Sequence, residues 1–241
     1  MNEILTINNL SKQFGKKRVL NDLKLHVPRG EFLTIFGPNG AGKTTLIKII
    51  STLSRPSSGE ITIADYDLTE EPENIRKLTG VISHNVYLYD ELTAKENLKF
   101  YGQMYSYPSD KLDKRILSLL NEIGLQYRMN DRVGTFSRGM KQRLSIARAI
   151  LHEPQLLLLD EPYTGLDQHA AQILNRILKH LHNGKRTIIM TTHNIELGFN
   201  LCDRVAILNH GQITYEKTRK QINVSKLKKA YMSEVEGILH D

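Results

Sequence analysis

The sequence of 241 residues contains one cysteine, no tryptophan and no long apolar run. A lone thiol excludes an internal disulfide framework, and we expect Cys202 to be a small buried residue. The most apolar stretches, TLIKII and LLLLD, are far shorter than the roughly 18 residues that predict a membrane-spanning helix. The opening MNEILTINNL lacks the basic and then apolar layout of a secretory signal. We therefore expect a protein of the reducing cytoplasm that does not itself cross a membrane.

The composition is that of a globular protein with an excess of cations. Hydrophobic residues make up 40% of the chain, which is enough for a core in one large or two small domains. The formal net charge is +7. This excess makes nucleic acid, an anionic membrane surface and a phosphate-bearing ligand plausible partners, and charge alone does not choose among them.

Strand and helix patterns alternate along most of the chain. Short strand patterns fill the first part, and from Thr93 to Gly124 the pattern becomes helical, because Thr93 and Glu96 form a capping box. Buried strands are predicted at 155–162 and 186–193, with a helix between them. Strands separated by helices predict an α/β fold with a parallel sheet and right-handed connections.

A glycine-rich segment, GPNGAGKTT, lies between a buried strand and a helix. It matches G-x-x-x-x-G-K-[ST] through Gly37, Gly42, Lys43 and Thr44. Glycines allow backbone N–H groups to surround phosphate oxygens, while Lys43 reaches the outer phosphates and Thr44 can bind Mg²⁺. The alternative is an ordinary glycine-rich turn. We predict that the whole segment binds phosphate groups, including Pro38, Asn39, Gly40, Ala41 and Thr45.

Two acids, Asp160 and Glu161, follow the apolar run LLLL. Behind a phosphate loop, one carboxylate can hold Mg²⁺ while its neighbour faces an attacking water. The pattern therefore predicts one Mg²⁺ ligand and one catalytic base in this pair. Without the phosphate loop, the same pair would be an ordinary strand-ending loop.

Taken together, the motifs resemble those of the ATP-binding cassette (ABC) ATPases over roughly residues 3–216. They occur in the order Phe14, GPNGAGKTT, SHNVYLYDELT, FSRGMKQR, LLLLDEP, TGLD and TTH. The resemblance implies a P-loop NTPase core, an N-terminal antiparallel β subdomain, a helical subdomain inserted at about 90–155, and a tail at 217–241. It also implies that two cassettes pair head to tail, with each ATP between the phosphate loop of one chain and the FSRGM segment of the other.

The resemblance implies that Asp160 is the Mg²⁺ ligand and Glu161 the catalytic base, and it assigns further site residues. Phe14 is expected to stack on adenine, His193 to contact the γ-phosphate and help hold Glu161, and Asp167 to lie in a loop that crosses the dimer interface. The alternatives are a core phenylalanine, a structural histidine and a simple helix cap. Ser137 and Gly139 lie where a helix should start, so their free N–H groups form an anion site. The resemblance identifies the anion as the γ-phosphate of the partner's ATP.

The segment FSRGMKQR departs from the usual family string L-S-G-G-Q at its first, third and fifth positions. Arg138 replaces a glycine, and it can either contact phosphate or point into solvent. We expect Arg138, Lys141 and Arg143 to flank and support the site rather than to form a nucleic-acid patch.

His84 stands where the family usually has glutamine. Nitrogen is a poor direct ligand for Mg²⁺, so we expect His84 to act in the site through an ordered water. A histidine here would make the linkage to the helical subdomain sensitive to pH near neutrality. The alternative is a structural or surface histidine. The surrounding SHNVYLYDELT is similar to that of cassettes from haem exporters of cytochrome c maturation and related exporters.

These features predict an ATP-hydrolysing subunit at the cytoplasmic face of the membrane. Its expected partners are an integral membrane permease, contacted around residues 84–92, and a second cassette, with a homodimer favoured over a heterodimer. No nucleic-acid partner is expected. The alternatives are a soluble ABC ATPase that acts on a ribosome or nucleic acid, which usually carries two cassettes and a charged linker, and a small-molecule kinase.

The sequence allows two interpretations for each of two further segments. The stretch Tyr101–Asp110 interleaves aromatic and polar residues and is either a docking surface or a folded loop. The C-terminal segment predicts an amphipathic helix with apolar positions at Leu227, Tyr231, Val235 and Ile238. Its cations either favour an anionic membrane leaflet or form a solvated helix face, which we prefer. They are Lys217, Arg219, Lys220, Lys226, Lys228 and Lys229.

Overall fold

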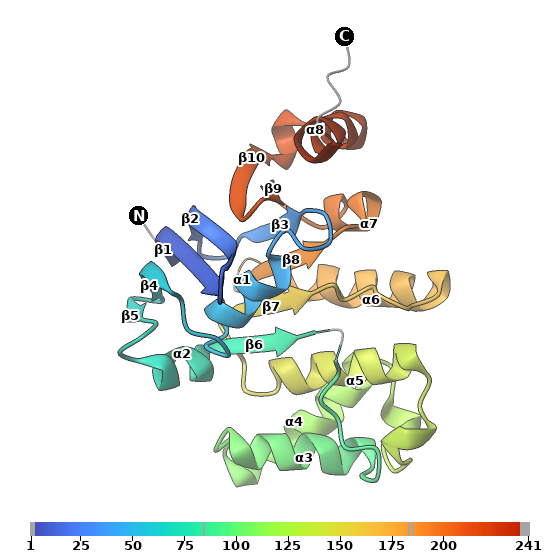
Figure 1. The fold of residues 1–241 in the computed structure, drawn as a ribbon. Helices are drawn as coiled ribbons and strands as arrows, with labels where there is room; N and C mark the ends of the chain where they lie inside the picture. The colour runs from blue at the N-terminus through green and yellow to red at the C-terminus, as the bar shows by residue number, and fades with distance from the viewer. Residues whose placement is uncertain (1–2, 84, 183, 185, 237–241) are drawn as a thin grey trace.

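The computed structural model describes residues 3–83, 85–182, 184 and 186–236. Two sheets stand side by side, and helices cover the larger one (Figure 1). The smaller, four-stranded sheet is antiparallel, as expected for the N-terminal part. In spatial order it contains β2 (Lys17–Pro28), β1 (Glu3–Phe14), β4 (Ser58–Ile63) and β5 (Tyr66–Asp67).

The larger sheet has six strands and carries the site. In spatial order it contains β10 (Gln212–Thr218), β9 (Arg204–Asn209), β3 (Phe32–Phe36), β8 (Thr187–Thr192), β7 (Leu156–Asp160) and β6 (Thr79–Ile82). Neighbours from β9 to β6 are parallel, whereas β10 pairs antiparallel with β9. Every residue of β3, β7 and β8 is buried because helices or strands cover both faces. The predicted parallel sheet is therefore confirmed, with an added antiparallel edge.

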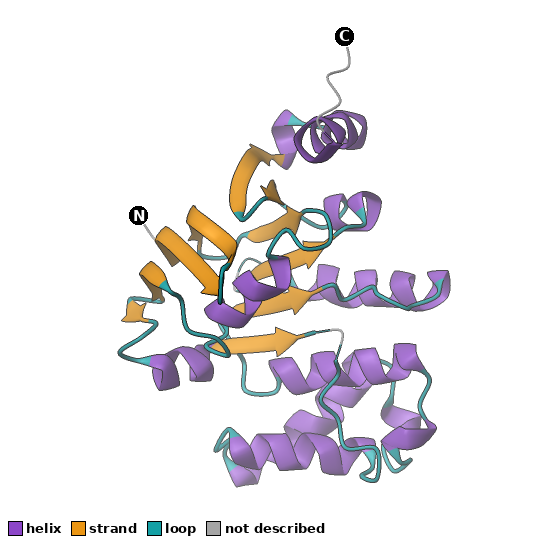
Figure 2. Cartoon of the chain, viewed as in Figure 1, coloured by secondary structure: helices purple, strands orange, loops and turns teal. Residues whose placement is uncertain are grey.

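The helices fall into two groups. Those beside the sheets are α1 (Lys43–Ile50), α2 (Pro72–Leu78), α6 (Gln168–Leu181), α7 (Ile195–Phe199) and α8 (Val224–Glu236). A separate helical part beyond β6 contains α3 (Ala94–Met104), α4 (Ser109–Glu122) and α5 (Arg138–Ile150) (Figure 2). Three short 3₁₀ helices lie at Gln126–Arg128, Val133–Thr135 and Arg219–Gln221.

Local signals start and stop these helices as the sequence predicts. At the start of α3, Thr93 Oγ1 accepts a hydrogen bond from the Glu96 N–H at 3.1 Å, and the Glu96 carboxylate accepts one from the Thr93 N–H at 2.8 Å. The predicted capping box is therefore confirmed. Beyond α4, Gly124 has φ of +68°, a conformation that ends the helix at little cost for glycine.

The C-terminal helix packs on the protein core. Leu227 is fully buried, and Tyr231 and Val235 pack against the same apolar cluster, whereas Ile238 lies outside the described residues. The ammonium of Lys228 lies 2.8 Å from the Glu196 carboxylate on α7. Cys202 is buried as expected, and this burial raises the pKa of its thiol to about 12.

The environment of His152 affects the stability of the fold. His152 stacks on the ring of Tyr105, with ring centroids 3.9 Å apart, and its Nε2 lies 3.2 Å from the Thr79 carbonyl oxygen. Its Nδ1 is buried without a hydrogen-bond partner among the described residues. Burial, together with the charges of Arg148 and Arg186, lowers the pKa of His152 to about 4.

This arrangement predicts an acid-sensitive contribution to stability. Because the folded pKa of His152 lies below the unfolded value near 6.5, the contribution is complete above about pH 6.5 and is lost as the pH falls toward 4. The shift corresponds to about 3 kcal/mol of unfolding free energy. Urea unfolding at a series of pH values should show a shallower acid loss for His152→Gln than for the wild type. The exposed His180→Gln serves as control, and equal slopes for all three proteins would contradict the prediction.

Candidate functional site

The phosphate loop connects β3 to α1 and depends on two glycines. Gly42 has φ of +109°, and a Cβ there would lie 2.7 Å from a methyl carbon of Leu20. A Cβ on Gly37 would lie 2.3 Å from the Leu208 carbonyl oxygen. The loop therefore fits between β2 and β9 only without side chains at these positions, and its backbone N–H groups precede the start of a helix.

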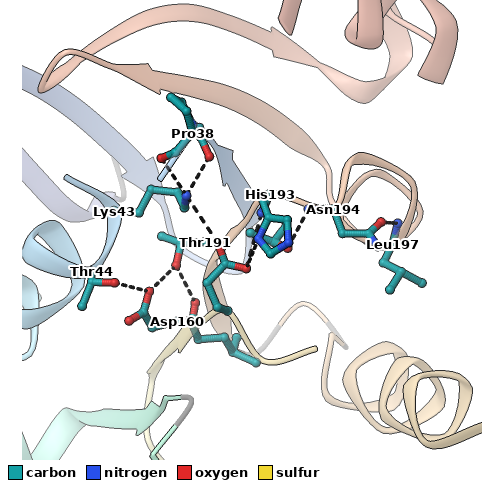
Figure 3. Close-up of polar contacts among 12 residues, drawn as sticks. Pro38, Lys43, Thr44, Asp160, Thr191, His193, Asn194 and Leu197 are labelled. Atoms are coloured by element: carbon teal, nitrogen blue, oxygen red, sulfur yellow. Dashed lines mark hydrogen bonds and ion pairs between the residues drawn. The ribbon is translucent and has the colours of Figure 1, made fainter. Parts of the chain in front are cut away.

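Lys43, the first residue of α1, is buried with its amine over the loop. Its Nζ donates hydrogen bonds to the carbonyl oxygens of Gly37 at 2.6 Å and Pro38 at 3.1 Å (Figure 3). The same nitrogen lies 3.4 Å from Glu161 Oε1. A buried ammonium is thus neutralised by oxygens and held where the outer phosphates of a nucleotide would bind.

Asp160 ends β7 and is only 2% exposed. Its Oδ1 accepts hydrogen bonds from Thr44 Oγ1 at 3.2 Å and from Thr191 Oγ1 at 2.7 Å (Figure 3). The phosphate loop and the acidic strand end therefore meet at this carboxylate. A carboxylate and a hydroxyl are oxygen donors of the kind that Mg²⁺ prefers, so Thr44 and Asp160 fit the ion predicted for them.

Glu161 lies between Lys43 and His193. His193 Nδ1 is 3.0 Å from Glu161 Oε2, and the His193 backbone N–H donates to the same oxygen at 3.4 Å. Glu161 has φ of +50°, a left-handed conformation that costs a non-glycine residue about 1–2 kcal/mol. Strain of this kind persists where the surroundings impose it, and here it turns the side chain toward the phosphate loop and His193.

A pocket of about 310 Å³ lies at the phosphate loop. Its lining comprises Lys17, Val19, Pro38, Asn39, Gly40, Gly42, Lys43, Thr44, Thr45 and Glu161. The sequence interpretation missed Lys17 and Val19, which come from β2, and also Thr191 behind Asp160. Thr191 could have been found from the sequence, because it stands opposite Asp160 once the two predicted parallel strands are placed side by side. Ala41 is buried beneath the loop.

Phe14 lies at the end of β1, paired with Lys17 across the strand turn. Its ring is 54% exposed, and the Lys12 ammonium lies 4.7 Å from the ring centroid. An exposed aromatic ring next to a pocket-lining residue is available for stacking, so the adenine role stays a prediction. The core alternative does not hold.

Ser137 and Asp167 begin neighbouring helices. Ser137 caps α5 by accepting a hydrogen bond from the Met140 N–H at 3.3 Å, and Asp167 caps α6 by accepting one from the Ala170 N–H at 2.7 Å. A Cβ on Gly139 would lie 2.9 Å from the Ala170 side chain, so the two helix starts are in close contact. Asp167 is therefore a helix cap, which leaves its role at a dimer interface as a prediction.

The FSRGMKQR segment faces a hollow of about 540 Å³, lined by Asn85, Val86, Phe136, Arg138, Lys141 and Gln142. None of these described residues lines the phosphate-loop pocket. We call FSRGMKQR, residues 136–143, the signature segment. Its face and the phosphate loop of one chain are therefore separate surfaces.

Two of the three signature cations have structural partners. Lys141 Nζ lies 2.8 and 2.9 Å from the two carboxylate oxygens of Asp90. Arg143 Nη1 donates to the Ile123 carbonyl oxygen at 2.8 Å, beyond the end of α4. Both contacts hold the helical part together, as expected for a scaffold. His84, predicted to act through water, lies outside the described residues.

Comparison with known proteins identifies the class that this geometry represents. Residues 20–164 match the family model described as ABC transporter. The chain belongs to the ABC transporter family and is an ATP-binding, ATP-hydrolysing subunit of that family. No helix in the described part of the chain combines the length and apolarity required to cross a bilayer.

Two curated relatives and one solved structure illustrate the likeness. The chain is 37% identical over 217 residues to the ABC transporter ATP-binding protein NatA of Bacillus subtilis (strain 168), covering 88% of each. It is 38% identical over 208 residues to the Nod factor export ATP-binding protein I of Rhizobium sp. (strain N33), covering 86% of this chain and 68% of the relative. A dimeric ATP-binding cassette bound to ADP and Pi superposes with a TM-score of 0.81 at 28% identity. The match covers 89% of this chain and 98% of the chain in that structure.

The geometry predicts that Glu161→Gln slows ATP hydrolysis by about 10²–10⁴-fold, because an amide cannot accept the proton of the attacking water. ATP binding should be retained, since the substitution preserves shape and leaves Lys43 in the loop. Phosphate release and nucleotide binding are measured on the same protein, with the exposed Glu60→Gln as control. Normal turnover in Glu161→Gln would remove this residue from the role of base.

Proposed function

We propose that this chain works as one of two identical cassettes, paired head to tail, that drive export through a separate membrane permease. The observation that carries this proposal is the separation of two half-sites on one chain. The phosphate loop with its acids opens into one pocket, while Ser137 and Gly139 belong to another face beside its own hollow. A second copy turned head to tail brings the missing half to each pocket.

The residues divide the chemistry of hydrolysis among them. Glu161 accepts a proton from the water that attacks the γ-phosphorus, while the bond to ADP breaks and phosphate is released. His193 holds the other side of the Glu161 carboxylate, and Lys43 stabilises charge on the phosphate oxygens. Ser137 and the start of α5 do the same from the partner chain. Thr44 and Asp160 would hold Mg²⁺, which when bound neutralises phosphate charge.

A groove between the sheet and the helical part supports a membrane partner. It encloses about 390 Å³ and is lined mainly by aromatic and apolar surface, with Leu53, Tyr87, Tyr101 and Tyr105 contributing and Arg148 at its base. Tyr87 and Leu53 are more than half exposed. An amphipathic segment of a permease would bury these side chains, and Tyr87 lies in the stretch expected to contact it. The Tyr101–Asp110 segment thus contributes to a groove.

Export is favoured because the relatives of this chain include a Nod factor export protein. The chain would then act at the cytoplasmic face of the membrane. A ribosome or nucleic-acid role is disfavoured because Lys141 and Arg143, two of the three cations that such a patch would use, are held by intramolecular contacts.

Mixing two inactive variants tests the head-to-tail arrangement. Glu161→Gln loses the base, and Ser137→Ala loses the signature hydroxyl, so each alone should hydrolyse ATP poorly. A mixed pair contains one pocket with both intact halves, so a 1:1 mixture should recover about one quarter of wild-type activity. The control is a chain that carries both substitutions. If the mixture stays as inactive as its components, the composite site is wrong.

Co-purification tests the permease. A tagged chain, expressed in its native cell and recovered from gently solubilised membranes without ATP, should bring down a polytopic membrane protein in fixed ratio. Replacing Tyr87 and Leu53 with aspartate should release that protein while leaving nucleotide binding intact, because the groove is separate from the phosphate loop. Recovery of ribosomes or nucleic acid without a membrane protein would overturn the proposal.

A further inference from the structure

The remaining signature cation, Arg138, packs against the TGLD loop of its own chain. A Cβ on Gly165 would lie 2.4 Å from Arg138 Cζ, 2.6 Å from Nε and 2.8 Å from Nη1. The guanidinium therefore lies directly on the Gly165 backbone, in space that any side chain would fill. Gly165 has φ of +74°, so the loop conformation and the contact both require glycine.

This contact joins two functional surfaces. Arg138 lines the hollow in front of the signature segment. Gly165 lines a different hollow of about 190 Å³ whose walls include Glu161 and His193. Gly165 thus lines the hollow of the pair expected to handle the attacking water, and the Arg138 guanidinium lies against the same residue. A shift of Arg138 would therefore act on a residue that lines the Glu161 hollow.

The electrostatics show that Arg138 is not placed there to stabilise its helix. It is the first residue of α5, where the positive end of the helix dipole disfavours a cation. Lys141, one turn later, is neutralised by Asp90, whereas Arg138 has no ion pair with any described carboxylate. A planar, weakly hydrated guanidinium can stack on a peptide, which an ammonium cannot do as well.

We propose that Arg138 is a positioning residue for hydrolysis. By stacking on Gly165 it ties the start of α5 to the loop between Glu161 and Asp167, and so holds the wall of the pocket in which Glu161 activates water. This inference rests on the proposed role of Glu161 as the base. Arg138 is an exposed residue, and its guanidinium rests on the Gly165 backbone of its own chain.

The test compares steady-state ATP hydrolysis by full-length Arg138→Ala, Arg138→Lys, Gly165→Ala and the double variant Arg138→Ala/Gly165→Ala. We expect Arg138→Ala to lower kcat about tenfold with little change in KM, since small displacements of catalytic groups reduce turnover strongly. Arg138→Lys should not restore kcat, because it keeps the charge and loses the plane. The double variant should be no slower than Arg138→Ala, because both substitutions break one contact.

The matched control is Arg176→Ala, which removes an exposed arginine from α6. This variant should hydrolyse ATP like the wild type. Thermal unfolding midpoints of all the variants show whether a loss of kcat reflects unfolding. Full activity in Arg138→Lys with a raised KM in Arg138→Ala would identify a phosphate contact and overturn the inference, as would multiplied losses in the double variant. If Gly165→Ala does not fold, the alanine and lysine variants of Arg138 still show whether Arg138 is a positioning residue.

Failure of this inference is distinguishable from failure of the proposed function. If Glu161→Gln is inactive while every Arg138 variant turns over like wild type, only the positioning role is wrong. If Glu161→Gln itself turns over normally, the assignment of the base is wrong, and the Arg138 inference is overturned with it.

Discussion

The parallel pairing of β7 with β8 is the constraint on which the site depends. Its register places Asp160 opposite Thr191, so that Asp160 at the end of β7, Glu161 after it and His193 after β8 lie at the same edge of the sheet. Because β3 is the next strand, the phosphate loop leaves the sheet at that edge as well. Both faces of these strands are buried, and a slip of one residue would bury the wrong side chains, so the register is strongly specified.

Within this frame, charge organises the local geometry. The Lys43 ammonium is surrounded by loop carbonyls and the Glu161 carboxylate, and that carboxylate also meets His193. A buried charge is tolerated only with such partners, so removing one of them disturbs the others. The left-handed backbone at Glu161 is the conformational cost of bringing the carboxylate to this place.

The signature segment shows how similar residues take different roles. Lys141 pairs with Asp90, Arg143 supports the carbonyl end of α4, and Arg138 stacks on Gly165. Two of the three thus have intramolecular polar partners, and the third lies against a neighbouring loop. The helical part and the sheet are thus connected by specific contacts around the start of α5, close to the start of α6, where cassette pairs are expected to meet.

The sequence by itself determined the order of elements, the phosphate loop, the acids Asp160 and Glu161 and the capping box at Thr93, because each depends on residues close together in the chain. Only the tertiary structure decided that β10 runs antiparallel at the sheet edge, that Lys17 and Val19 line the pocket, and that Thr191 supports Asp160. The same holds for the stacking of Arg138 on Gly165. These contacts join residues far apart in sequence, and such pairs carry no local periodicity or motif that reveals which side chains will meet.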